Sequence, residues 1–159
     1  MRLLLEHVKN TDVLVLLQSK SALTRPWVIL ELFTALTNDV PVVALNVANS
    51  YQYDYVEAID FLFHFDTEIV TANPGAAELL REHDVDPVDV AFLLSDALPN
   101  IISCPFNPNG SSRQIRASME DLAGNVTAAE GSQICGCVDV CVAGHFRSNQ
   151  NGSTPATKY

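Results

Sequence analysis

Glu31 is the only ionisable residue in the largely apolar stretch that runs from Trp27 to Leu36, and it lies four residues after the single tryptophan of the chain. Residues four apart share one face of a helix. A helix beginning at Pro26 would therefore place Trp27, Glu31 and Thr34 on one stripe. Such a carboxylate either keeps a helix face in contact with water or acts on a ligand in a cleft, and the periodicity alone favours the first interpretation.

The elements that would hold this helix can be read from the apolar pattern. Short apolar runs that are continuous rather than alternating are typical of parallel strands covered on both faces. Three such runs are Asp12–Ser19, Pro41–Val47 and Asn100–Cys104. Helix-like stretches are Leu3–Lys9, Pro26–Asn38, Tyr55–Phe65, Gly75–Glu82, Val88–Leu98 and Ser111–Gly124. Strands that alternate with helices predict an α/β fold with an open, mainly parallel sheet in a flavodoxin-like layout, which binds ligands at the carboxyl ends of its strands.

Residues with known preferences for helix ends support these bounds. Pro26 suits the first turn of a helix, and Thr24 is a candidate for its cap. Ser111 or Ser112 can cap the last helix, which Gly124 would end. Small and polar residues dominate the end of the chain, so we expect residues 127–159 to form a disordered tail.

The stretch LLQSKSALTRPWVILEL, residues 16–32, resembles the conserved segment of Toll/interleukin-1 receptor (TIR) domains. In that family a strand ending in serine is followed by Trp-Cys-x-x-Glu-Leu at the start of a helix. Ser19 precedes Trp27 by the family's interval of eight residues, and Glu31 follows at the right distance. The later stretches VPVVALNV and LPNIISCPFNPNGSSRQIRASMEDL look like the family's next strand and its last strand and helix. The resemblance predicts a TIR-like domain over residues 1–126.

The sequence departs from the family pattern at several positions. Val28 stands where the family has cysteine, and Ala22 stands where a tyrosine is common. The family's first strand and the loop after its second strand have no counterpart in the chain. We therefore expect a three-layer TIR-type fold that is truncated at its N-terminus.

The resemblance implies an enzymatic role for Glu31. In TIR domains that are enzymes, the glutamate at this position is required to cleave the nicotinamide–ribose bond of NAD+. That cleavage leaves an oxocarbenium-like ribosyl cation, which an ionised glutamate can oppose while it holds the ribose hydroxyls. Glu31 is thus the candidate catalytic residue, and Ser19 and Trp27 are candidates for contact with NAD+. Trp27 can instead brace the helix. NAD+ would be a substrate, and no cofactor is predicted.

The size of the electrostatic effect decides between catalysis and association. Opposite charges 4 Å apart attract by about 1 kcal/mol in water and about 4 kcal/mol at an effective dielectric near 20. These energies correspond to roughly fivefold and thousandfold accelerations, so Glu31 needs a closed, dry cleft. Part of the family's cleft comes from regions that have no counterpart here. We therefore predict a signalling module that associates with other TIR domains as a homo-oligomer, with an NAD+ glycohydrolase as the alternative and a truncated relic as a third possibility.

Composition limits the partners and the compartment. The 159 residues carry nine basic and nineteen acidic side chains, a net charge of −10, which argues against nucleic acid and anionic membranes as partners. No apolar run reaches the ~20 residues of a membrane-spanning helix, and no secretory signal is evident. We expect a cytoplasmic protein.

Two groups of residues have types that bind metal ions. They are Asp60, His64 and Glu68, spaced four apart, and Cys135, Cys137, Cys141 and His145 near the end. A solvated helix face and free thiols are the favoured interpretations, and no metal site is predicted. The tyrosine-rich stretch 51–55 follows a predicted strand and could line a cleft or form a contact surface, although a surface loop is the favoured interpretation.

Overall fold

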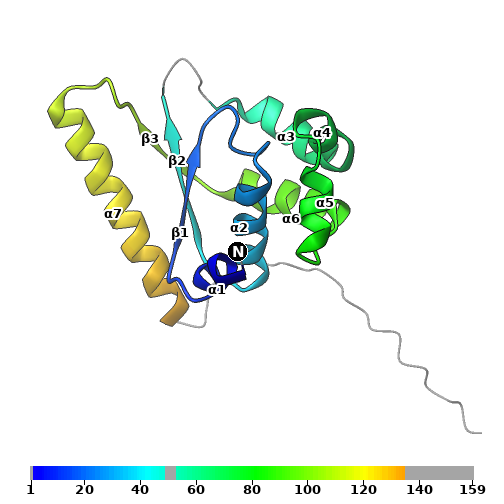
Figure 1. The fold of residues 1–159 in the computed structure, drawn as a ribbon. Helices are drawn as coiled ribbons and strands as arrows, with labels where there is room; N and C mark the ends of the chain where they lie inside the picture. The colour runs from blue at the N-terminus through cyan, green and yellow to red at the C-terminus, as the bar shows by residue number, and fades with distance from the viewer. Residues whose placement is uncertain (1, 49–52, 135–159) are drawn as a thin grey trace, which may run out of the picture.

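The computed structural model describes residues 2–48 and 53–134, and it has the predicted α/β fold with an open parallel sheet (Figure 1). Its strands are β1 (Leu14–Gln18), β2 (Val42–Val47) and β3 (Ser103–Phe106), in the order β1-β2-β3. The predicted parallel pairing of the first two apolar runs is confirmed, with Leu14 opposite Val42. The third strand begins later than predicted, because Leu98–Asn100 form a turn of 3-10 helix.

Helices cover both faces of the sheet, which gives three layers (Figure 1). The helices of the described residues are α1 (Arg2–Lys9), α2 (Pro26–Thr37), α3 (Tyr55–Phe63), α4 (Phe65–Ala72), α5 (Ala76–Glu82), α6 (Pro87–Ala97) and α7 (Ser112–Ile134). Helix α7 lies on one face, against β2 and β3. Helix α2 lies on the other face, where it packs against α1, α5 and α6.

The alternation of side chains along each strand divides the core between the two faces. The main apolar cluster joins Leu16 of β1 to Leu30 of α2 and to Leu94 of α6. A smaller cluster lies under α7 and includes Val43 and Leu45 of β2. Helix α2 is therefore fixed by contacts on several sides, and this fixes the position of Glu31.

The helix ends agree with the sequence at two of the four predicted positions, and the fourth, Gly124, is described below. Pro26 is in the first turn of α2, as predicted. Thr24 is not the cap: its hydroxyl donates to the Ser21 carbonyl oxygen at 3.1 Å, and Arg25 holds the cap position without a side-chain hydrogen bond. The backbone N–H of Ser111 donates to Gln114 Oε1 at 2.8 Å and the Gln114 N–H donates to Ser111 Oγ at 3.3 Å, which is a capping box.

The predicted helix Tyr55–Phe65 is two helices. His64 has a non-helical backbone conformation that ends α3, and α4 begins at the next residue. The break turns the side chain of Phe65 into the core, where it is fully buried. Asp60 Oδ1 and His64 Nδ1 lie 3.5 Å apart, but within the described residues these two side chains and Glu68 are not placed to hold a metal ion. Helix α4 was not predicted, although Phe65 and Ile69, four residues apart, are both buried.

The prediction that the last helix ends at Gly124 is wrong, because α7 continues to Ile134. The expected boundary between residues 126 and 127 falls inside this helix, and residues 127–134 are not a disordered tail. Leu122, Val126 and Ala129 form an apolar stripe that packs on the sheet, and this packing outweighs the low helix propensity of Gly124. Neither α7 nor any other helix of the described residues combines the length and hydropathy needed to cross a membrane.

Substitutions on α6 test where the core lies. Leu94 is fully buried in the main cluster, whereas Phe92 on the same helix is 74% exposed. We expect Leu94→Ala to lower the free energy of unfolding by about 2–5 kcal/mol and Phe92→Ala to change it by about 0.5 kcal/mol or less. Urea denaturation of the full chain measures both values. Similar losses for the two variants would contradict the packing of α6.

Candidate functional site

Among the described strands, β1 and β3 are the outer strands of the sheet, and the free side of β1 is the main candidate for a functional site. The Leu14 N–H donates to the Pro41 carbonyl oxygen at 2.9 Å, just before β2. Because backbone groups alternate in direction along a parallel strand, those of Val15 and Leu17 point away from β2. No strand of residues 2–48 or 53–134 pairs with this side. The N–H and C=O groups of two residues are therefore open to a further strand.

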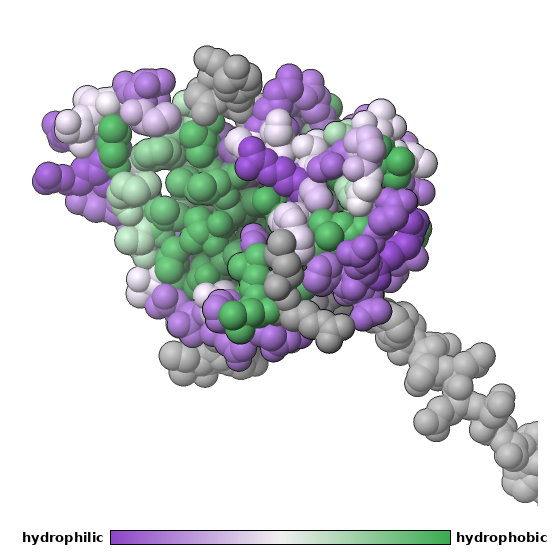
Figure 2. All heavy atoms as spheres, in the orientation of Figure 1, coloured by the Kyte–Doolittle hydropathy of each residue, from purple (hydrophilic) through white to green (hydrophobic). Residues whose placement is uncertain are grey.

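The side chains of this strand leave apolar surface exposed as well. Val15 is 39% and Leu17 is 57% exposed, while Leu16 between them is buried. The exposure arises because α7 packs mainly on β2 and β3 and leaves the outer part of this face uncovered. Figure 2 shows the result as a broad apolar area between α7 and α2.

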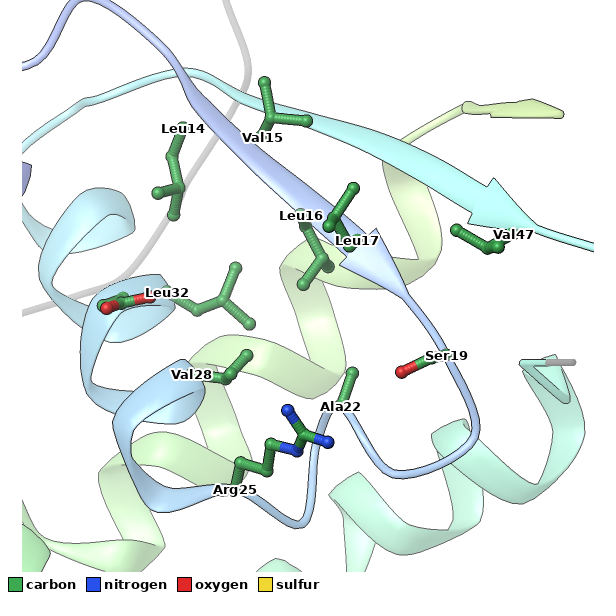
Figure 3. A pocket seen from close by; sticks show the side chains of 11 residues that line it. Leu14, Val15, Leu16, Leu17, Ser19, Ala22, Arg25, Val28, Leu32 and Val47 are labelled. Carbon is green, nitrogen blue, oxygen red and sulfur yellow. The ribbon is translucent and has the colours of Figure 1, made fainter. Parts of the chain in front are cut away.

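A cavity of about 410 Å³ follows the free side of β1 (Figure 3). It reaches both faces of the strand and extends to the first half of α2. Its lining consists of Leu14, Val15, Leu16, Leu17, Ser19, Ala22, Arg25, Val28, Glu31, Leu32 and Val47. Three of these residues, Ser19, Arg25 and Glu31, are polar, so the cavity is mainly apolar. Its long, open shape along a strand suits an extended segment of polypeptide.

The structure brings two of the three predicted site residues together. Ser19 and Glu31 both line the cavity, whereas Trp27 does not. The Trp27 ring packs edge-on against His83, which directly follows α5, with ring centroids 5.4 Å apart, and so braces α2. Glu31 lines the cavity together with Leu14 and Leu16 of β1. Thr34, which shares its predicted stripe, is buried, so this stripe is not a solvent-exposed face.

The carboxylate of Glu31 lies in a partly dehydrated position without an ionic partner. Partial burial raises the pKa of Glu31 above its ordinary value of 4.5. The ion pairs within the described residues are Lys9–Glu6 and His64–Asp60, so neither Glu31 nor Arg25 forms one. Both charged groups are thus available to a ligand or to polar groups of a partner.

A second polar group lies at the carboxyl ends of β1 and β2. The Asn46 amide donates to the Tyr55 hydroxyl at 3.0 Å, and that hydroxyl donates to Oε1 of the buried Gln18 at 3.3 Å. The Tyr53 ring packs edge-on against Tyr55, and burial followed by the charge of Tyr55 raises the pKa of Tyr53 to about 12. Sequence reasoning missed Gln18 and Asn46. The available signal was that each of the first two apolar runs has a side-chain amide near its carboxyl end.

A smaller cavity of about 280 Å³ lies on another side of the loop that follows β1. Tyr53 is in its lining, so part of the tyrosine-rich stretch 51–55 contributes to a cleft; Tyr51 and Gln52 lie outside the described residues. In the described residues, no group of three His, Cys, Asp or Glu side chains is placed to hold a metal ion. The cluster Cys135, Cys137, Cys141 and His145 lies outside those residues.

Comparison with known proteins does not identify the family. No protein-family model, no curated protein and no solved structure matches the chain. The fold and the site therefore stand on the geometry described above, and kinship with TIR domains stays a prediction.

Replacement of Glu31 tests its electrostatic environment. A raised pKa means that burial disfavours the charged form, so Glu31 costs stability at neutral pH and this cost disappears as the pH falls below about 4.5. We expect Glu31→Gln to raise the melting temperature slightly at pH 7, and the difference from wild type to shrink towards pH 4. Thermal unfolding across this range measures it, with the exposed Glu78→Gln as control. A destabilised Glu31→Gln variant at pH 7 would show that the carboxylate has a favourable partner.

Proposed function

We propose that this chain is a TIR-like protein-interaction module that acts in cytoplasmic signal transduction through association with like domains, and that it forms homo-oligomers through the free side of β1. The observation that carries the proposal is the coincidence, on one strand, of unpaired backbone groups and exposed apolar side chains at Val15 and Leu17. A partner strand would form hydrogen bonds with these backbone groups and would also cover these apolar side chains.

The physical basis is the addition of one strand to another at the edge of a sheet. Backbone hydrogen bonds to Val15 and Leu17 would supply affinity, and the side chains on either face would supply specificity. Two copies can meet through the same surface about a two-fold axis, which is the commonest arrangement in homo-oligomers. Strand β1 has five residues, so the contact is small and the association reversible.

One observation favours a second candidate function, NAD+ glycohydrolysis. Ser19, Arg25 and Glu31 line the same cavity, so a carboxylate, a hydroxyl and a cation would face a bound nucleotide together. Glu31 would hold the ribose hydroxyls and oppose the developing positive charge. The cavity is open to water along β1, which keeps the local dielectric high and limits the electrostatic acceleration to a few-fold.

Lysine substitutions test association through β1. A lysine on an edge strand discourages pairing, so we expect Val15→Lys to weaken self-association at least tenfold. Val70→Lys, on the exposed side of α4, is the matched control and should associate like wild type. Sedimentation velocity over a range of concentrations measures the three proteins. A wild type that stays monomeric throughout, or equal weakening by the two substitutions, would overturn the proposal.

A nicotinamide-release assay tests the second candidate. We expect the full chain to release nicotinamide from NAD+ weakly or not at all, and Glu31→Gln to abolish whatever release occurs. Glu78→Gln should leave it unchanged, because that side chain is exposed on α5 and outside the cavity. Release that persists in Glu31→Gln would remove the catalytic role of Glu31, whereas rapid release that this variant loses would make hydrolysis the leading function.

A further inference from the structure

We infer that the partner of the free side of β1 is β1 of a second copy, paired antiparallel about a two-fold axis at Leu16, with Arg25 of each copy opposite Glu31 of the other. This pairing rests on the proposed function, which assigns self-association to this side of the strand, and it adds the register, the charge pairs and the size of the assembly. In this arrangement the three-stranded sheets that the described residues form in the two copies become one continuous sheet.

The open backbone groups of β1 select the direction and the register of the pairing. Within β1, the N–H and C=O groups of Val15 and Leu17 point away from β2. An antiparallel partner centred on Leu16 places Val15 of one copy opposite Leu17 of the other, and each such pair exchanges two hydrogen bonds. All the open groups of the two strands are then paired. An axis moved by one residue either way would bring Val13 or Ser19, which lie outside the strand, into these pairs.

The same register matches the side chains on both faces of the joined sheet. On the face towards α7, the exposed Val15 of one copy lies directly opposite the exposed Leu17 of the other, and apolar cross-strand pairs stabilise a sheet. On the face towards α2, Leu16 lies against Leu16 of the second copy. The buried cluster that contains Leu16 therefore continues from one copy into the other.

The first half of α2 is the other surface that meets its copy at the axis. Helix α1 packs on α2 and contributes Val8 to a cluster with Ala35, in the second half of α2. The first half lines the open cavity through Val28. Figure 3 shows Val28 pointing from α2 towards Leu16, with Arg25 nearer the carboxyl end of β1. An axis at Leu16 therefore also places the Val28 side chains of the two copies across from each other.

The charges beside Val28 are complementary in a two-fold arrangement. Arg25 precedes and Glu31 follows Val28 by three residues each, so the axis sets the cation of one copy opposite the carboxylate of the other, twice. Neither side chain has an ionic partner within the described residues. Glu31 is half-buried, and water screens such a charge less than one on the open surface. The backbone of β1 and the charges of α2 thus require the same axis.

The other outer strand of the described sheet, β3, is closed to this kind of pairing. The Ala48 N–H donates to the Phe106 carbonyl oxygen at 2.7 Å, so the backbone groups of Phe106 face β2 and those of Ser103 and Pro105 face the free side of β3. Proline has no N–H, and at an edge strand it discourages pairing. When the two copies of β1 join in the centre, both outer edges of the sheet are β3 edges that carry Pro105. The assembly therefore stops at two copies.

Cysteine cross-linking between separately prepared variants measures the register. We expect an oxidised equimolar mixture of Val15→Cys and Leu17→Cys to form mainly a disulfide between positions 15 and 17, because opposed residues have Cα atoms about 5.5 Å apart, within disulfide reach. Each variant alone should cross-link about tenfold less through its new cysteine, since diagonal neighbours lie about 7–8 Å apart. Mass spectrometry identifies the linked peptides and distinguishes them from links through native cysteines. Predominant links between identical positions, or no link between positions 15 and 17, would overturn the register.

Exchange of charges on α2 tests the ion pairs. We expect Arg25→Glu and Glu31→Arg each to weaken self-association about tenfold or more, because like charges then face each other across the axis. An equimolar mixture of the two variants should associate at least as tightly as wild type, since both contacts then join opposite charges. Arg81→Glu and Glu78→Arg make the same charge changes on the exposed side of α5 and should associate like wild type. A loss that mixing does not restore would overturn the charge pairs.

Sedimentation velocity over a range of concentrations separates the two-fold pairing from the proposed function. We expect wild type to approach the mass of two copies and not to exceed it, and larger assemblies would overturn the closed pair. If Val15→Lys weakens association while Arg25→Glu and Glu31→Arg associate like wild type, the proposed function stands and the two-fold pairing fails. A wild type that stays monomeric at every concentration overturns both.

Discussion

The parallel pairing of β1 with β2 is the interaction on which the rest of the structure depends. Its register places Leu16 in the main cluster with α2 and leaves Leu17 on the opposite face. A shift of the register by one residue would exchange these two environments, bring a different side chain against α2 and displace Glu31 from the cavity. Because β1 pairs on one side only within the described residues, the same interaction that builds the sheet also leaves its free side open.

The parts of the fold that could be predicted are those in which local pattern and tertiary packing agree. Continuous apolar runs indicated β1 and β2, and Pro26 indicated the start of α2. The failures occur where packing overrides local preference. The break at His64 exists because Phe65 turns into the core, and α7 passes through Gly124 because Val126 and its neighbours pack on the sheet. Neither the burial of Phe65 nor the packing of Val126 on the sheet can be inferred from the local sequence.

The candidate site was predictable in part. The resemblance to TIR domains singled out Ser19 and Glu31, which line one cavity, but also Trp27, which braces α2 against α5. The apolar run around β1 predicted a strand covered on both faces, yet Leu17 is more than half exposed. The order of the strands decides which of them lies at the edge of a sheet. The local sequence pattern of a strand does not show this order. This mismatch between the apolar sequence and the exposed position is the physical reason to expect a partner on this strand.

The lining of the cavity bears on both candidate functions, because a strand and a nucleotide would use the same space. A strand needs apolar walls and backbone partners, which Leu16, Val28 and the open groups of β1 provide. NAD+ carries a diphosphate and two riboses, and for these the cavity offers one cation, Arg25, in a chain with a net charge of −10. A strand that covered the free side would lower the dielectric around Glu31 but would also fill the space that the ribose needs. Closing the cavity with polypeptide therefore favours association over catalysis, and Glu31 then acts as a partly buried charge that tunes stability with pH.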